Sequence, residues 1–148
     1  MIGTVMRLGL MAGALSAVLL PAGRAAAAIA GADFLSKVDT NGDKTISMKE
    51  LDVYAGRRYD LIAKQSGGSV TSLQLGGRIP VKDFQAARGK SHDPNPDALS
   101  RAEFVGYAEK LFIEANTQVK KGSSPADGTL DLDELNTSAG KKLIELLE

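Results

Sequence analysis

A run of oxygen-bearing residues in the first third of the chain has the residue types and the spacing that a hard metal cation requires. Its members are Asp39, Asn41, Asp43, Thr45, Ser47 and Glu50. Alternate residues of a tightly curled loop point to its inner side, so these oxygens could converge on one ion such as Ca2+. The chain has no Cys and one His, which nearly excludes thiolate and multi-histidine transition-metal sites.

The spacing matches the twelve-residue EF-hand loop, whose ligands stand at positions 1, 3, 5, 7, 9 and 12. Asp39 opens the loop, Ser47 at position 9 acts through a water, and Glu50 closes the cage from the start of the next helix. Position 6 usually holds glycine because the chain turns there with positive φ, and here it holds Lys44. A left-handed non-glycine residue costs about 1–2 kcal/mol. A solvated Asp-rich turn before a helix is the alternative interpretation.

A second candidate loop lies near the C-terminal end of the chain. Its ligand-type residues, which fit positions 5, 7, 9 and 12, are Asp127, Thr129, Asp131 and Glu134. The front half is altered: regular counting places Ser123 and Pro125 at positions 1 and 3, and Pro125 has no side-chain oxygen. Alternatively, Asn116 is the original first ligand and about seven residues are inserted after it. A retained turn that packs but holds no metal is the other interpretation.

Two further segments look like eroded versions of the same loop. Residues 63–74 keep Gly68 at the turn position but contain no carboxylate, so we expect no metal there. The other segment has its glutamate one position early and lacks the turn glycine; its candidate ligands are Asp93, Asn95, Asp97 and Glu103. It is predicted to be either a weak metal site or a Pro-rich turn that caps the following helix.

The segments between these loops have helical periodicity. We expect helices over residues 48–64, 80–88, 100–116 and 132–148, the last either continuous or broken at Gly140. Ser100 and Glu103 are predicted to form a capping box, and the apolar positions of the first helix are Leu51, Tyr54, Leu61 and Ile62. The predicted fold class is therefore all-α: a compact helix–loop–helix (EF-hand) bundle of four units, two of them degenerate.

One apolar residue marks the middle of each of the four loops. These residues are Ile46, Val70, Leu99 and Leu130. In paired loops such residues lie opposite one another. The sequence leaves open whether Ile46 pairs with Val70 or with Leu130.

The N-terminal segment has the composition of a secretory signal. Arg7 precedes the apolar run Leu8–Leu20, which is short for a membrane span, and Ala25–Ala28 offers a small-residue cleavage site. We predict a signal peptide over residues 1–28, an EF-hand domain over 29–148, a periplasmic or secreted location, and no membrane attachment after cleavage. Cleavage removes two basic residues and no acidic one, which takes the net charge from +0 to about −2 and argues against nucleic acid as a partner.

The spacing and several segments resemble the lanmodulin family, exported lanthanide-binding EF-hand proteins of methylotrophic bacteria. The similarity is greatest in Phe112–Asn116, Asp127–Leu135 and Ser138–Gly140, and the first two loops are separated by only about twelve residues. The resemblance implies a small three-helix core with peripheral metal loops and a preference for trivalent ions over calcium. The chain departs from the family at Thr40 and Ser47, where the family has Pro and Asp, so Ca2+ and a trivalent lanthanide ion both remain candidate ligands.

The sequence therefore predicts a cation-binding protein that acts as a buffer, carrier or sensor. The alternative is an EF-hand-derived interaction module that binds an exported partner protein and little or no metal. An enzyme is not expected, because the chain lacks a Cys nucleophile, a Ser–His–Asp arrangement and a phosphate-binding glycine-rich loop. Which cation is physiological, how many bind and the oligomeric state stay open.

Overall fold

The computed structural model describes residues 22–88, 97–118 and 127–148, with side chains from Ala30 onward. This part of the chain is mostly helical, in agreement with the all-α class, and its helices are α1 (Ala22–Val38), α2 (Met48–Gln65), α3 (Val81–Arg88), α4 (Arg101–Thr117), α5 (Leu132–Leu135) and α6 (Ser138–Leu147). Four two-residue strands lie between them, namely β1 (Ile46–Ser47), β2 (Val70–Thr71), β3 (Ala98–Leu99) and β4 (Thr129–Leu130).

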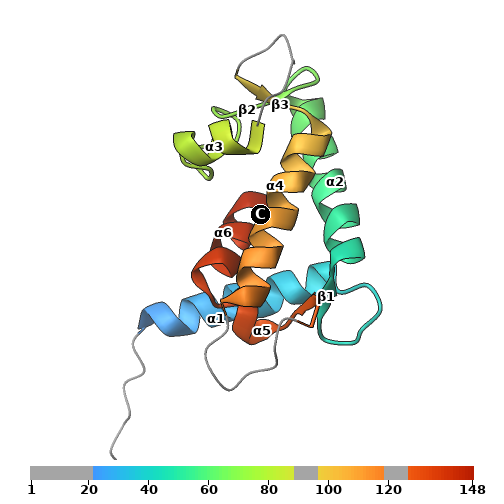
Figure 1. Cartoon of the computed structure of the whole chain (residues 1–148), viewed down its shortest axis with the longest axis vertical. Helices are drawn as coiled ribbons and strands as arrows, with labels where there is room; N and C mark the ends of the chain where they lie inside the picture. The colour runs from blue at the N-terminus through green and yellow to red at the C-terminus, as the bar shows by residue number, and fades with distance from the viewer. Residues whose placement is uncertain (1–21, 89–96, 119–126) are drawn as a thin grey trace, which may run out of the picture.

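The long helices α2 and α4 lie side by side and antiparallel, with one strand pair at each end (Figure 1). At one end β1 pairs with β4, so that Ile46 is opposite Leu130. At the other end β2 pairs with β3, which places Val70 opposite Leu99. Of the two pairings that the sequence left open, the pairing of Ile46 with Leu130 is therefore the one present, and the pairing of Ile46 with Val70 is wrong.

The core lies where α1, α2, α4 and α6 meet. Its largest fully buried side chains include Phe34 of α1, Leu51 of α2, Phe104 and Phe112 of α4, and Leu143 of α6. Among the apolar positions expected in α2, Leu51 and Ile62 are buried, whereas Leu61 is 54% exposed. The helix turns Ile62 and Ala63 inward instead, which leaves Leu61 on the outer face.

Three helices begin with the same cap. A side-chain oxygen at the N-cap accepts a hydrogen bond from the main-chain N–H three residues on, and the glutamate there accepts one in return. The pairs are Ser47–Glu50, Ser100–Glu103 and Asp131–Glu134. The predicted cap at Ser100 is thus confirmed. All three glutamates are also candidate metal ligands, Glu50 and Glu134 in the two main loops and Glu103 in the weaker third segment.

The C-terminal segment forms two helices, but the break between them is not at Gly140, the position that the sequence suggested. The chain leaves its helical path between α5 and α6, at Asn136 and Thr137, and Gly140 lies in the first turn of α6. A Cβ at Gly140 would be 2.4 Å from the Glu134 carbonyl oxygen and 2.6 Å from that of Leu135. Gly140 therefore serves the close approach of α6 to α5 rather than ending a helix.

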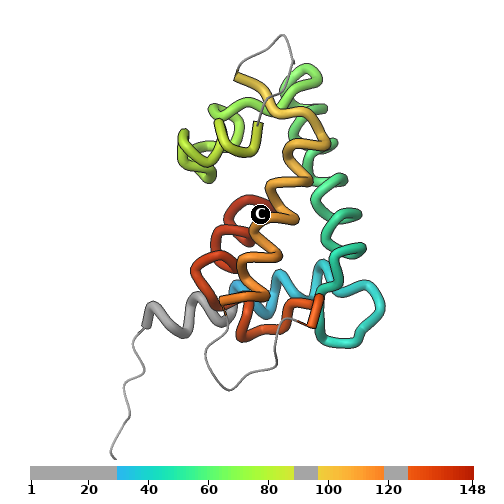
Figure 2. The backbone as a smooth tube through the Cα atoms, viewed as in Figure 1, coloured from blue at the N-terminus to red at the C-terminus, as the bar shows by residue number. Residues whose placement is uncertain are grey.

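None of the helices in the described segments is both long and apolar enough to cross a membrane. The apolar run Leu8–Leu20 lies outside the described residues. Helix α1 continues through the predicted cleavage site Ala25–Ala28, and its later part crosses one end of α2 (Figure 2).

We expect Gly140→Ala to lower the free energy of unfolding by about 1–3 kcal/mol, because the new methyl group overlaps the α5 backbone. The matched control is Gly106→Ala in α4, where a Cβ meets no atom within 4 Å. That change should stabilise the protein by up to about 1 kcal/mol through helix propensity. Urea denaturation of the two variants measures both effects, and equal stability would contradict the packing role of Gly140.

Candidate metal centre

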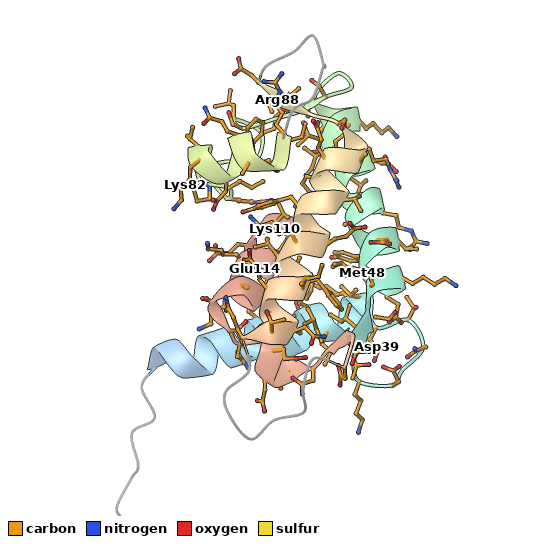
Figure 3. All side chains as sticks on the ribbon, viewed as in Figure 1. Asp39, Met48, Lys82, Arg88, Lys110 and Glu114 are labelled. Atoms are coloured by element: carbon orange, nitrogen blue, oxygen red, sulfur yellow. The ribbon has the colours of Figure 1, made fainter. Side chains whose placement is uncertain are left out.

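The carboxylates of loop 39–50 are bonded to the main chain of their own loop. Asp39 accepts hydrogen bonds from the Gly42 N–H through Oδ1 (2.7 Å) and from the Lys44 N–H through Oδ2 (2.9 Å). Asp43 Oδ1 accepts from the N–H and the hydroxyl of Thr45, at 2.8 and 2.7 Å. These bonds curl the loop between Met48, at the start of α2, and Asp39 (Figure 3).

Glu50 joins the beginning of this loop to the beginning of α2. Its Oε1 accepts from the Thr40 N–H (2.8 Å), the Thr40 hydroxyl (2.9 Å) and the Asn41 N–H (3.2 Å). Its Oε2 accepts from the N–H and hydroxyl of Ser47, at 2.9 and 2.8 Å. The N–H of Ser47 makes the largest contribution to lowering the pKa of Glu50 to about 2, and the Ser47 hydroxyl and Thr40 add to it. A buried carboxylate is therefore held ionised by donors of the protein itself.

Lys44 has the backbone conformation that the sequence pattern requires at position 6. Its φ is 70°, and it is the one non-glycine residue with positive φ in the described part of the chain. The side chain is exposed, which lets the ammonium group reach water. The loop thus keeps its turn without glycine, at a cost of about 1–2 kcal/mol.

Loop 127–134 has the same local pattern. Asp127 Oδ1 accepts from the N–H and hydroxyl of Thr129, at 2.9 and 2.8 Å. Gly128 makes the turn with a φ of 86°. Glu134 Oε2 accepts from the Asp131 N–H at 2.9 Å, and Asp131 Oδ1 accepts from the Glu134 N–H at the same distance. The two loops lie next to each other because β1 pairs with β4.

The environment of Glu134 differs from that of Glu50 in its balance of charges. Glu134 is 6% exposed, and burial raises its pKa. The nearby carboxylates of Asp131, Asp127 and Asp133 also raise the pKa, whereas the Asp131 N–H opposes the shift. Glu134 is thus a buried acid surrounded by acids, an arrangement that a cation would relieve.

Asn116, from the last turn of α4, reaches this second loop. Its Nδ2 donates to the Thr129 carbonyl at 2.7 Å, and only 5% of the residue is exposed. Its Oδ1 is buried and has no hydrogen-bond partner among the described residues. Of the two alignments of the front half, the structure brings Asn116 to the loop, whereas Ser123 and Pro125 lie outside the described residues. The sequence alone could not predict the contact between Asn116 and Thr129, because it does not fix the path of the chain between Asn116 and Asp127.

No protein-family model matches this sequence, and no curated protein matches it. The resemblance to the lanmodulin family, and the metal it implies, therefore stay predictions.

The third candidate site is only partly within the described residues. Asp93 and Asn95 lie outside them, and Asp97 is exposed just before β3. Glu103 Oε2 accepts from the N–H and hydroxyl of Ser100, at 2.7 and 2.8 Å. Its carboxylate caps α4, as the predicted capping box requires. Glu50 caps α2 in the same way, so the cap alone does not decide between a weak metal site and a Pro-rich turn.

Across the described ranges, no three Asp, Glu, His or Cys side chains gather as a group that could hold a metal ion. In both loops the carboxylates accept main-chain N–H groups instead of converging on one point. Asn41 and Asp43 of loop 39–50 are exposed, and a hollow of about 250 Å3 adjoins Glu50, Thr40 and Ser47. Binding of a cation would therefore require these side chains to exchange hydrogen bonds for metal ligation.

The two glutamates predict opposite effects of pH on the metal-free protein. Because the pKa of Glu50 falls from 4.5 to about 2 on folding, its stabilisation is present above about pH 4.5 and is lost as the pH falls toward 2. Because the pKa of Glu134 is raised above 4.5, its contribution is lost as the pH rises through that raised value.

We therefore expect Glu50→Gln to destabilise the metal-free protein at pH 7 by about 1–3 kcal/mol and to flatten its acid denaturation. Glu134→Gln should leave stability at pH 7 unchanged or increase it, because it removes a buried charge from among three aspartates. Urea denaturation from pH 3 to pH 7 measures both. Equal destabilisation by the two substitutions at pH 7 would contradict this account.

Proposed function

We propose that the chain is a periplasmic EF-hand cation-binding protein that acts as a buffer, carrier or sensor, with Ca2+ or a trivalent lanthanide ion as its ligand. The observation that supports this most is the adjacency of two loops, each with three carboxylates at ligand spacing, joined by the β1–β4 pair. The carboxylates are Asp39, Asp43 and Glu50 in one loop and Asp127, Asp131 and Glu134 in the other.

The donor set of each loop fits a hard cation. Carboxylate, amide and carbonyl oxygens are the ligands that Ca2+ prefers, and no thiolate or imidazole competes within the two loops. Three negative charges per loop neutralise a trivalent ion and exceed the charge of a divalent one. The choice between the two ions is therefore left to loop size and rigidity.

An ion would stabilise the second loop more than loop 39–50, although the front half of the second loop is altered in sequence. Glu50 already accepts five hydrogen bonds, so an ion at loop 39–50 must replace favourable contacts. Glu134 lies among three aspartates, and the nearby Asn116 has a buried oxygen with no partner among the described residues. We infer that Asn116 is an additional ligand of the second site, together with Asp127, Thr129, Asp131 and Glu134.

The alternative function is an interaction module for an exported partner protein that binds little or no metal. The observation in its favour is that the carboxylates of loop 39–50 are hydrogen-bonded to the main chain of their own loop, including the capping box at Ser47 and Glu50. On this alternative, the chain keeps its structure and binds its partner equally with and without a chelator. Loss of helix in chelator would exclude it.

Calorimetric titration of the metal-stripped mature protein with lanthanum, and separately with calcium, tests the proposal. We expect saturable binding of at least one ion with a stoichiometry of about two, one per loop. Tight binding of lanthanum with weak binding of calcium would favour a lanthanide function. Comparable weak binding of both would favour a calcium protein. No binding of either ion would overturn the proposal.

We expect Asn116→Ala to weaken one of the two ion-binding events by about tenfold or more and to leave the other unchanged. The matched control is Thr117→Ala, one residue further along α4, whose hydroxyl bonds the carbonyls of Ile113 and Glu114 in its own helix. Equal affinities for Asn116→Ala and Thr117→Ala would show that Asn116 is not a ligand.

A further inference from the structure

A polar hollow lies on the opposite end of α2 from the two carboxylate loops. Its volume is about 330 Å3, at the small end of the range for ligand sites. The lining residues come from the second half of α2, the residue after it, and the turns that follow β2. They are Arg58, Leu61, Ile62, Gln65, Ser66, Gln74 and Arg78. The set contains two arginines and no acidic residue.

Arg58 has a donor group that the described residues leave unused. Its Nη2 donates to the main-chain oxygen of Glu148, which fixes the guanidinium in place. Its Nε is buried and has no hydrogen-bond partner among the described residues. A buried N–H that lacks an acceptor is unfavourable, and more so when the group is charged. An acceptor in the hollow would remove that cost after a small rotation of the Arg58 side chain that turns Nε toward it.

A second wall of the hollow supplies further donors. Gln74 accepts the Thr71 N–H through Oε1 at 2.6 Å, so the amide group presents its NH2 end as a donor. Arg78 is exposed and lies on the same turn segment. Leu61 and Ile62 add an apolar side to the hollow.

We propose that this hollow is a binding site for a small free oxyanion, which carries a phosphate or a carboxylate group, held between Arg58 and Arg78. Planar guanidinium groups match the oxygens of both anions and form charge-assisted hydrogen bonds with them. None of its lining residues belongs to the carboxylate loops at the β1–β4 end, so anion binding here can be tested separately from metal binding.

The test is a calorimetric and NMR titration of the full mature chain with sodium phosphate and, separately, sodium malonate, at constant ionic strength set by chloride. The metal is removed beforehand and the chelator is dialysed away, because chelators are themselves polycarboxylates. The NMR readout is the Arg58 Nε–H signal. We expect it to shift in a saturable manner with at least one of the two anions, and to stay unchanged with chloride.

Arg78→Gln should weaken the binding about tenfold or more, the effect of losing one charge-assisted hydrogen bond. Arg78 is the primary variant because it is exposed and its loss leaves the Arg58–Glu148 contact intact. The matched control is Arg57→Gln, which removes the same charge from the neighbouring, exposed residue of α2 that does not line the hollow.

Binding of phosphate alone would assign the site to phosphate groups, binding of malonate alone to carboxylates, and either supports the proposal. Absence of a saturable Arg58 shift with both anions would overturn it. Equal weakening by Arg57→Gln and Arg78→Gln would also overturn it, since that result indicates general charge attraction. Neither result bears on cation binding, which is measured with the same metal-free protein by adding lanthanum or calcium.

Discussion

The structure depends on carboxylates that accept main-chain N–H groups where a loop turns into a helix. Three of the described helices, α2, α4 and α5, begin with an N-cap oxygen and a glutamate three residues later. At each start the glutamate satisfies an N–H that the helix cannot bond internally. In loop 39–50 the same glutamate also bonds Thr40 and Asn41, so that it closes the loop as well as starting the helix.

This constraint connects local loop geometry to the packing of the whole domain. Glu50 and Glu134 each follow a two-residue strand, and these strands pair through Ile46 and Leu130, which are both fully buried. Buried Leu51 and Leu135 follow the two glutamates directly and place them against the core. A change in the ligands of one loop is therefore expected to affect the other loop and the entry into α2.

The two loops show how the same residue type acquires different properties from its surroundings. Hydrogen-bond donors around Glu50 lower its pKa, whereas burial, with the charges of three aspartates, raises the pKa of Glu134. The sequence pattern ranks loop 39–50 first because its ligand positions are complete. If the proposed function holds, the contacts favour the second loop, because burial and nearby aspartates leave Glu134 less stable as an anion than Glu50.

Local patterns in the sequence predicted the helices and the cap at Ser100, because apolar periodicity and capping residues act within a few positions. They left open whether Ile46 pairs with Leu130 or with Val70, because that choice depends on contacts between distant parts of the chain. The role of Gly140 could not be predicted, because a glycine is needed there only where the α5 backbone packs against α6, which is a tertiary contact. In the sequence, Asn116 is the first ligand in only one of two alignments. The sequence does not fix the path of the chain between Asn116 and Thr129, so it could not predict their hydrogen bond.

In the proposed function, the carboxylates of loops 39–50 and 127–134 give up hydrogen bonds to their own main chain when they bind a cation. The most direct measurement is a heteronuclear NMR titration of the metal-stripped protein with lanthanum, followed at the amide signals of Thr40, Ser47 and Asp131 and the side-chain amide of Asn116. We expect the chemical shifts of these signals to change with added ion until saturation, while the shifts of residues at the β2–β3 end stay constant. Unchanged signals at these four groups under excess ion would contradict it.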